Sequence, residues 1–260
     1  MNHVKSADGT PIAFDRSGSG PAVVLVGGGF ADRHDPIFTA LAEALAPRFT
    51  VFNYDRRGRG DSGDTMPYAV QREIEDLRAV IDEAGGRAVV FGGSSGGALA
   101  LEAAAEGVAI SRLAVFEPPY VTDESRPPLP SEKEIGSLVK EGRRGDAVEL
   151  FMTKGADVPA EMLAGLRGEP FWPGVEAVAH TLAYEAAIMD GGRIPAQRFA
   201  AIGIPILVLA GTQTSARMSD AAQAVADVLP DARLQALEGQ AHGQLDPADL
   251  ASALSAFFAA

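Results

Sequence analysis

Short apolar runs alternate with amphipathic stretches along most of the chain. Six runs are apolar on both faces, as strands are in a parallel sheet that helices cover on both sides. Between them, hydrophobic residues recur at steps of three and four positions, the spacing of an amphipathic helix. This alternation predicts an α/β fold with a mostly parallel sheet flanked by helices. The predicted strands are Pro21–Val26, Thr50–Tyr54, Ala88–Phe91, Leu113–Phe116, Ile204–Ala210 and the weaker Ala232–Leu237, and the predicted helices are Pro36–Leu45, Val70–Ala84, Gly96–Ala105 and Ser219–Leu229, with Ser219 as the N-cap of the last.

Two segments depart from the alternation. His3–Ser6 and Ile12–Arg16 flank an Asp-Gly pair and predict an opening antiparallel hairpin. From Pro118 to about Ala200 we expect helices and loops without a strand, which is typical of a helical cap inserted between two strands of the sheet. The predicted division is a core of residues 1–117 and 201–260 with a cap of residues 118–200. The predicted cap helices are Ser131–Arg143, Asp146–Thr153, Pro159–Leu166 and Gly174–Met189.

Composition narrows the function classes. The 260 residues include 22 Lys and Arg against 35 Asp and Glu, a formal net charge of −13. Nucleic acid is therefore not an expected partner, because binding a polyanion needs a basic surface. The absence of cysteine excludes disulfides, zinc–thiolate centres and a cysteine nucleophile. No apolar stretch has the ~20 residues of a membrane helix, and the polar start does not resemble a signal peptide, so we expect a soluble cytoplasmic protein with no membrane partner.

The strongest motif is the run Phe91–Gly97, FGGSSGG, between a predicted strand and a predicted helix. Gly-x-Ser-x-Gly in this context is typical of a nucleophile elbow, a turn so tight that the residues two positions from the nucleophile must be small. Both Ser94 and Ser95 fit the frame. We favour Ser94, because it follows the strand at the expected point, and Ser95 would then donate its backbone N–H to an oxyanion. A phosphate-binding turn and a purely structural turn are the alternatives.

With this motif the chain resembles the α/β-hydrolase family, over nearly its whole length and most weakly in the cap. The family's first long strand usually leads into His-Gly, where this chain has Gly27 before Gly28-Gly29-Phe30. The resemblance implies that Gly29 or Phe30 supplies a second oxyanion N–H. Asp55–Ser62 matches the family pattern Asp-x-Arg-Gly-x-Gly-x-Ser. We interpret it as a turn held by Asp55 and Arg57, and an anion site made by its three arginines is the alternative.

The resemblance also implies a general base, which a serine nucleophile needs at neutral pH. His242 follows the last predicted strand, at the family's position for the catalytic histidine. It would take the proton from Ser94 and return it to the leaving group, and a surface-loop histidine is the alternative. We interpret His180 as a helix-face residue. His34 lies in a predicted solvated loop, and we predict no metal site there.

The acid of the expected triad departs from the family pattern. Thr214 occupies the acid's usual position after the strand that follows the cap. A threonine can orient an imidazole but cannot stabilise its charged form. Some family members instead carry the acid after the strand that precedes the cap, where this chain has Glu117. We therefore predict Glu117 as a relocated acid, with Asp123 as second candidate. A Glu117 that only caps the start of the cap is the alternative.

These residues favour a serine-type hydrolase of a small hydrophobic ester, lactone or related acyl compound. It would need no cofactor, and the cap would supply apolar walls for its substrate. A cofactor-free lyase or cyclase on the same fold is the main alternative, because Thr214 replaces the usual acid. A ligand-binding protein with a degenerate site is the third, and the sequence is also compatible with a homodimer. The expected pocket residues are Phe151, Met152, Phe171, Trp172 and Tyr184.

Overall fold

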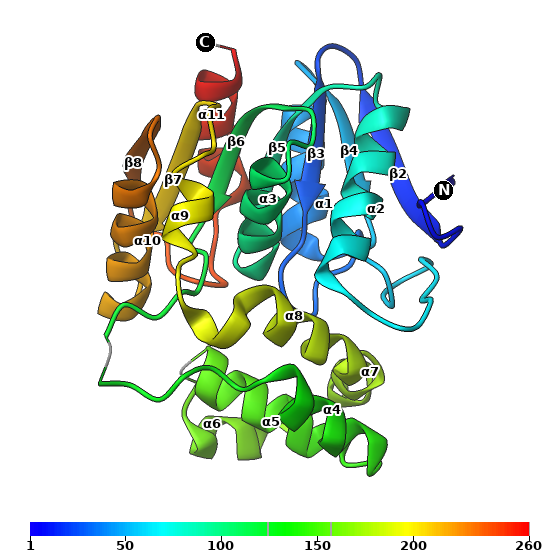
Figure 1. Cartoon of the computed structure of the whole chain (residues 1–260), viewed down its shortest axis with the longest axis vertical. Coiled ribbons are helices and arrows are strands. Elements are labelled where there is room, and N and C mark those ends of the chain that lie inside the picture. Colours follow the sequence, from blue (N-terminus) through cyan, green and yellow to red (C-terminus); the bar gives the residue numbers. More distant parts are fainter. Residues whose placement is uncertain (124, 157, 260) are drawn as a thin grey trace.

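The computed structural model describes residues 1–123, 125–156 and 158–259. Within these ranges the strands form one eight-stranded sheet, and each of the six predicted strands is present in it (Figure 1). The strands are β1 (Asn2–Lys5), β2 (Pro11–Gly18), β3 (Ala22–Val26), β4 (Thr50–Tyr54), β5 (Ala88–Gly93), β6 (Ile110–Phe116), β7 (Ile206–Gly211) and β8 (Ala232–Leu237).

The strand order is β1-β2-β4-β3-β5-β6-β7-β8. The predicted opening hairpin is confirmed, because β1 pairs antiparallel with β2, and β2 pairs antiparallel with β4. Each remaining pair is parallel. The carboxyl ends of these parallel strands meet at one edge of the sheet, which is where α/β folds place their ligand sites.

Helices cover both faces of the sheet, as the apolar strands require. Side chains alternate across a strand, so Val24 and Val26 of β3 belong to one core cluster, while Val23 and Leu25 belong to the other. The first cluster includes residues of α2, α3, α9 and α10, and the second includes residues of α1 and α11. The bounds are α1 (Pro36–Leu45), α2 (Val70–Glu83), α3 (Ser95–Ala105), α9 (Ala196–Phe199), α10 (Ala216–Val228) and α11 (Pro247–Phe258).

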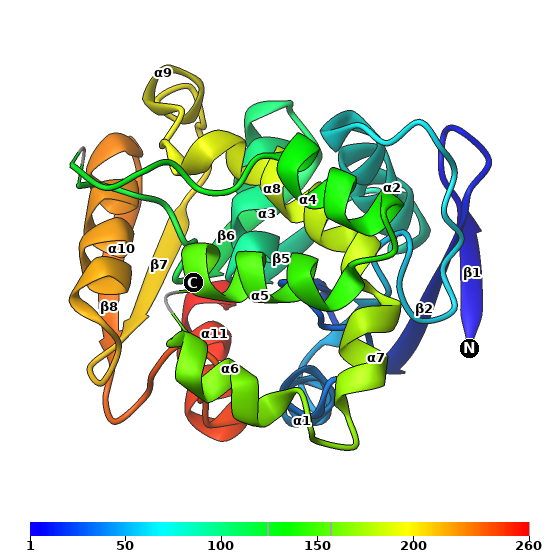
Figure 2. The same cartoon turned by 90° about the horizontal axis from the view of Figure 1, so that it is seen from below.

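A group of helices between β6 and β7 lies over the carboxyl edge of the sheet (Figures 1 and 2). Its described residues include no strand, as the sequence predicts. These helices pack around a small core of their own, which contains Ile135, Val148 and Leu182. The exact division of the chain into core and cap stays a prediction. The bounds are α4 (Glu132–Lys140), α5 (Arg144–Gly155), α6 (Ala160–Leu166), α7 (Trp172–Ala177), η1 (Ala179–Thr181), α8 (Leu182–Met189) and η2 (Asp190–Gly192).

Two helix predictions are wrong in detail. The stretch Gly174–Met189 is not one helix, because the backbone leaves the helical region at Val178, with φ −100° and ψ 8°, and separates α7 from η1 and α8. Helix α10 begins earlier than predicted. Its N-cap is Ser215, whose side chain accepts the N–H of Met218, whereas Ser219 lies inside the helix.

Candidate active site

Ser94 occupies the tight turn between β5 and α3, with φ 53° and ψ −129°. A non-glycine residue in such a conformation costs about 1–3 kcal/mol, which the surrounding structure must offset. The turn leaves no room beside it. A Cβ at Gly92 would lie 2.6 Å from the carbonyl oxygen of Gly96, and a Cβ at Gly96 would lie 2.4 Å from that of Val26. These two glycines are the ones that the Ser94 frame requires.

The alternative frame has a weaker steric basis. It would centre on Ser95 and use Gly93 as the small residue before it. A Cβ at Gly93 would meet only the ring of Phe38, at 3.4 Å. Ser95 is also the first residue of α3, not the residue with positive φ. The local geometry therefore makes Ser94 the residue at the apex of the turn.

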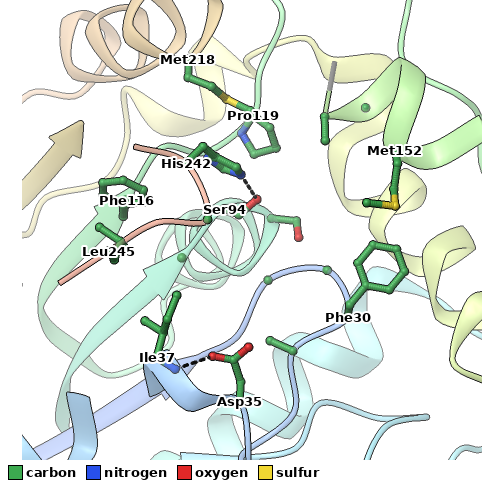
Figure 3. Close-up of a pocket in the computed structure, with 18 of the residues that line it drawn as sticks. Phe30, Asp35, Ile37, Ser94, Phe116, Pro119, Met152, Met218, His242 and Leu245 are labelled. Atoms are coloured by element: carbon green, nitrogen blue, oxygen red, sulfur yellow. Dashed lines mark hydrogen bonds between the residues drawn. The ribbon is translucent and has the colours of Figure 1, made fainter. Parts of the chain in front are cut away.

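Three side chains that are far apart in the sequence form a continuous hydrogen-bonded chain. Ser94 Oγ lies 3.2 Å from His242 Nε2 (Figure 3), and His242 Nδ1 lies 2.9 Å from Glu117 Oε2. A carboxylate only accepts hydrogen bonds, so Nδ1 donates to Glu117 and Nε2 faces the Ser94 hydroxyl as an acceptor. Glu117 is fully buried, while His242 is 27% exposed. The arrangement has the geometry of a nucleophile, a base and an orienting acid.

Two other groups donate to the Glu117 carboxylate. The backbone N–H of Gly211 donates to Oε1 at 2.8 Å, and the Thr214 hydroxyl donates to Oε2 at 3.1 Å. Thr214 therefore lies beside Glu117 and hydrogen-bonds to it. Glu117 itself has φ 44°, so the chain turns sharply where β6 ends. The second candidate acid, Asp123, is exposed and accepts hydrogen bonds from the neighbouring Ser125.

The loop after β3 passes directly beside Ser94. A Cβ at Gly28 would lie 3.0 Å from Ser94 Cβ, and Phe30 takes a left-handed conformation with φ 66°. The N–H of Ser95 lies in the first turn of α3, where backbone donors have no intrahelical acceptor. Gly29, Phe30 and Ser95 all line the same cavity as Ser94. Residues from two elements, each with a backbone N–H, therefore line the cavity that contains the hydroxyl.

A cavity of about 350 Å³ opens beside Ser94 and His242. Its walls are mostly apolar, and Asp35 is the one carboxylate among its described lining residues, which include no Lys or Arg. Asp35 Oδ1 accepts the N–H groups of Ile37 and Phe38 as the N-cap of α1 (Figure 3). The apolar lining comes from the α/β core and from the helices between β6 and β7. Its residues are Phe30, Ala31, Ile37, Phe38, Phe91, Phe116, Pro119, Leu129, Phe151, Met152, Ala156, Met189, Met218 and Leu245.

The predicted cap residues divide into two groups. Phe151 and Met152 of α5 line the cavity, and the Phe151 ring meets that of Phe30 edge-on at 5.7 Å. Phe171 and Trp172 do not line it. Phe171 is 52% exposed on the cap surface, and Trp172 is buried within the cap, where its Nε1 donates to Glu176.

Tyr184 is also absent from the cavity wall. Its ring stacks on Tyr68 at 3.8 Å, and its hydroxyl donates to Asp64 at 2.8 Å. The expectation fails for Trp172 and Tyr184 because they pack in the cap's own core, and it fails for Phe171 because that side chain is mostly exposed. Sequence reasoning missed most of the wall, which comes from strand ends and adjoining loops such as Phe91, Phe116 and Leu245. Their position at the carboxyl ends of predicted strands is the signal that could have found them.

The arginine-rich segment is structural, as predicted. Asp55 accepts the N–H groups of Arg33 and Asp61, and Arg57 forms a buried pair with Asp76. Arg56 and Arg59 are paired with buried carboxylates as well, Glu73 and Glu185. The alternative of an anion site is therefore not supported, because each of the three guanidiniums already has an acidic partner.

The other histidines take no part in the chain of bonds at Ser94. His34 is exposed, and burial is the main cause that lowers the pKa of His180, which lies 3.6 Å from Asp64. In the part of the chain that the structure describes, no group of three or more His, Asp or Glu side chains is arranged to hold a metal ion. Among the same residues, no helix is long and apolar enough to cross a membrane.

Comparison with known proteins places the chain in a family. A model of the alpha/beta hydrolase family matches residues 23–253. The crystal structure of an alpha/beta hydrolase from Sphaerobacter thermophilus is 56% identical, covers 99% of this chain and 100% of its own, and has a TM-score of 0.91.

Two curated proteins match shorter segments of the chain. The uncharacterized hydrolase YraK of Bacillus subtilis is 35% identical over 107 residues, which is 39% of this chain and 38% of YraK. The lipase LipV of Mycobacterium tuberculosis is 36% identical over 110 residues, which is 42% of this chain and 41% of LipV. The matched segments thus span less than half of either relative.

The chain belongs to the alpha/beta hydrolase family, and it is an enzyme of that family. The predicted fold, an α/β sheet flanked by helices, and the predicted family are both confirmed.

Proposed function

We propose that the protein is a serine-type hydrolase of a small, hydrophobic, uncharged ester, lactone or related acyl compound. Ser94 is the nucleophile, His242 the general base and acid, and Glu117 the residue that orients His242. The observation that carries this proposal is the unbroken series of hydrogen bonds from Ser94 through His242 to the buried Glu117. The lipase name of one relative is in keeping with an ester substrate.

In the first half-reaction Ser94 Oγ attacks the substrate carbonyl carbon while its proton passes to His242 Nε2. The carbonyl oxygen becomes an oxyanion, which the N–H groups of Ser95 and Gly29 stabilise, with Phe30 as the alternative to Gly29. The intermediate collapses, and His242 protonates the departing alcohol oxygen. An acyl group stays on Ser94. Glu117 keeps Nδ1 protonated and stabilises the imidazolium.

In the second half-reaction water attacks the acyl carbon, and His242 accepts a proton from that water. Collapse of the second tetrahedral intermediate breaks the bond to Ser94 Oγ, which recovers its proton from His242. The carboxylic acid product leaves. The overall change is the addition of one water across the acyl–oxygen bond, so the cycle needs no cofactor.

The cavity supports an uncharged, apolar substrate. A carboxylate in the substrate would find no Lys or Arg among the described lining residues and would be repelled by Asp35. Apolar groups would instead displace water from Phe30, Phe151 and Met152, which is favourable at about 25 cal/mol per Å². Both considerations favour simple acyl chains over dicarboxylic substrates.

The alternative of lyase or cyclase chemistry rested on Thr214 in the place of the usual acid. Because Glu117 hydrogen-bonds to His242 and Thr214 hydrogen-bonds to Glu117, the substitution at 214 no longer favours that alternative. A ligand-binding role would leave the strained Ser94 without a purpose.

The test is labelling with a fluorophosphonate, which reacts covalently with activated serines, followed by intact-mass measurement. We expect one adduct in the wild type and in Ser95→Ala, and none in Ser94→Ala. Turnover of p-nitrophenyl butyrate should disappear with the adduct. Loss of labelling in Ser95→Ala alone would mean that the other frame is correct. A folded wild-type protein that forms no adduct and hydrolyses no ester would overturn the proposal.

A further inference from the structure

A buried arginine, Arg59, hydrogen-bonds to the peptide group between Gly28 and Gly29. Its carbonyl oxygen, on Gly28, accepts a short hydrogen bond from Arg59 Nη1. In a planar trans peptide the C=O and the following N–H point in opposite directions. The bond from Arg59 therefore directs the N–H of Gly29 away from the arginine. Gly28 lies against Ser94, and both glycines line the cavity.

Further bonds fix the same loop. Arg59 Nη1 also lies 3.3 Å from the carbonyl oxygen of Ala31, and Arg56 Nη1 donates to that of Gly27 at 3.2 Å. The two guanidiniums thus contact backbone carbonyls before, at and after Gly28. A loop rich in glycine has many accessible backbone conformations. The hydrogen bonds from the two arginines therefore restrict the loop more than the backbone preferences of its own residues do.

A cap residue holds the two arginines in place. Glu185 of α8 is fully buried, and its Oε1 pairs with Arg59 Nη2 and lies 2.9 Å from Arg56 Nη1. The Thr181 hydroxyl, also in the cap, accepts from Arg59 Nε at 3.2 Å. A buried charge must be paired, so Arg59 and Glu185 depend on each other.

The electrostatics agree with this arrangement. Burial raises the pKa of Glu185, but the attraction of Arg56 and Arg59 outweighs it and holds the pKa of that carboxyl below its usual value. Glu185 is thus paired with both arginines that contact the backbone carbonyls of the Gly27–Ala31 loop.

We propose that Arg59, held by Glu185 of the cap, is a positioning residue that orients the Gly29 N–H as an oxyanion donor. The inference rests on the proposed function, since it concerns the same serine site. It also gives the cap a role in catalysis besides walling the cavity. Arg59 is not among the described residues that line the cavity, so we expect its effect to act entirely through the peptide that it holds.

The test compares Arg59→Met with Arg57→Met. Both substitutions remove a buried arginine from the same turn. Arg57, however, contacts Asp76, Asp8 and a backbone carbonyl of α2. Among the described residues it has no hydrogen bond to the Gly27–Ala31 loop. The probe substrate is p-nitrophenyl butyrate. The second readout is the rate constant of fluorophosphonate labelling, because that reaction also develops charge on an oxygen in the same space. Urea unfolding measures stability separately.

We expect Arg59→Met to lower kcat about 10- to 100-fold with KM changed less than threefold, because one misdirected donor costs somewhat less than a removed one. Labelling should slow by a similar factor. Arg57→Met should lose stability but keep kcat and the labelling rate within threefold of wild type. If Arg59→Met does not fold, the double variant Arg59→Met/Glu185→Gln replaces it. The double variant removes one buried positive and one buried negative charge, and it should show the same loss of kcat.

Kinetics within threefold of wild type in a folded Arg59 variant would overturn the inference. Equal losses of kcat in Arg59→Met and Arg57→Met would also overturn it, because the effect would then be one of general stability. Failure of the proposed function gives a different result: the wild type itself would show no adduct at Ser94 and no turnover.

Discussion

Glu117 and His242 are separated by 125 positions in the sequence, yet Glu117 Oε2 lies 2.9 Å from His242 Nδ1. Glu117 directly follows β6, and His242 lies in the loop between β8 and α11. The parallel sheet brings the two ends together, because among the described strands β7 alone separates β6 from β8 in the sheet order. The carboxylate thereby reaches the imidazole from the strand before the cap.

This relationship predicts the effect of Glu117→Gln. A glutamine can still hydrogen-bond to His242 but carries no charge to stabilise the imidazolium and favours the wrong tautomer, so kcat should fall about 10³- to 10⁴-fold. Thr214→Val is the matched control. It removes one neutral hydrogen bond to the same carboxylate, so kcat should fall less than about tenfold. Steady-state kinetics check both variants, and similar small losses in the two would argue against an orienting role for Glu117.

The charge of the cavity predicts a change of selectivity in Asp35→Asn. Asparagine caps a helix as well as aspartate does, so α1 should keep its stability. Removing the charge should raise kcat/KM for p-nitrophenyl hemisuccinate about tenfold relative to p-nitrophenyl butyrate. Asp32→Asn is the control, since Asp32 accepts from His34 and is not among the lining residues. An unchanged ratio in Asp35→Asn would mean that Asp35 does not act on the bound acyl group.

The cavity walls predict which phenylalanine sets acyl-chain length. Phe151→Ala should enlarge the cavity and shift the preference among p-nitrophenyl esters by at least two carbons towards longer chains, since each buried CH₂ contributes about 0.8 kcal/mol. Phe171→Ala should leave the preference unchanged, because its side chain is mostly exposed. A chain-length series of kcat/KM values tests this, and an effect at Phe171 would contradict the cavity as described.

The turn at Ser94 predicts unequal tolerance of two neighbouring glycines. Gly96→Ala should lower the free energy of unfolding by about 1–3 kcal/mol, because its Cβ would overlap the carbonyl oxygens of Val26 and Gly27. Gly93→Ala should cost less than about 1 kcal/mol, since only the Phe38 ring is near. Urea denaturation of both variants gives the comparison. The reverse order would favour Ser95 as the apex of the turn.

The pKa of Asp8 predicts a pH-dependent part of the stability. Burial raises this pKa, but hydrogen bonds from Thr10 and Arg57 outweigh it and lower the pKa from 3.8 to about 2. A carboxyl whose pKa is lower in the folded state stabilises the fold above pH 3.8, and the contribution is lost as pH falls towards 2. Asp8→Asn should therefore be less stable than wild type at pH 7, and the difference should shrink between pH 4 and pH 2.

Thermal unfolding across that pH range measures the effect. Asp231→Asn makes the same substitution at an exposed aspartate and serves as the control. A difference between Asp8→Asn and wild type that persists unchanged at pH 2 would contradict the assignment.

The features that sequence analysis predicted are those set by short-range physics. The apolar runs became strands because both faces of a parallel sheet are buried, and the glycines around Ser94 are where the steric demands of the turn require them. Glu117 could be predicted as the acid because it follows a strand at the position where some members of the resembled family carry theirs. The strands and the turn needed only neighbouring residues, whereas the choice of Glu117 came from the resemblance to the family.

Other features depended on contacts between distant segments. An apolar cap residue fills either the cavity or the cap's own core, and the cap's packing decided that Phe151 faces the cavity whereas Trp172 does not. The pairing of Arg59 with Glu185 joins positions 126 apart, and neither residue shows in the sequence which partner it will have. The chain's local pattern thus determined the sheet, the turn and the chemical groups of the site. Tertiary packing decided the cavity walls and the buried ion pairs, because both depend on how the cap sits on the core.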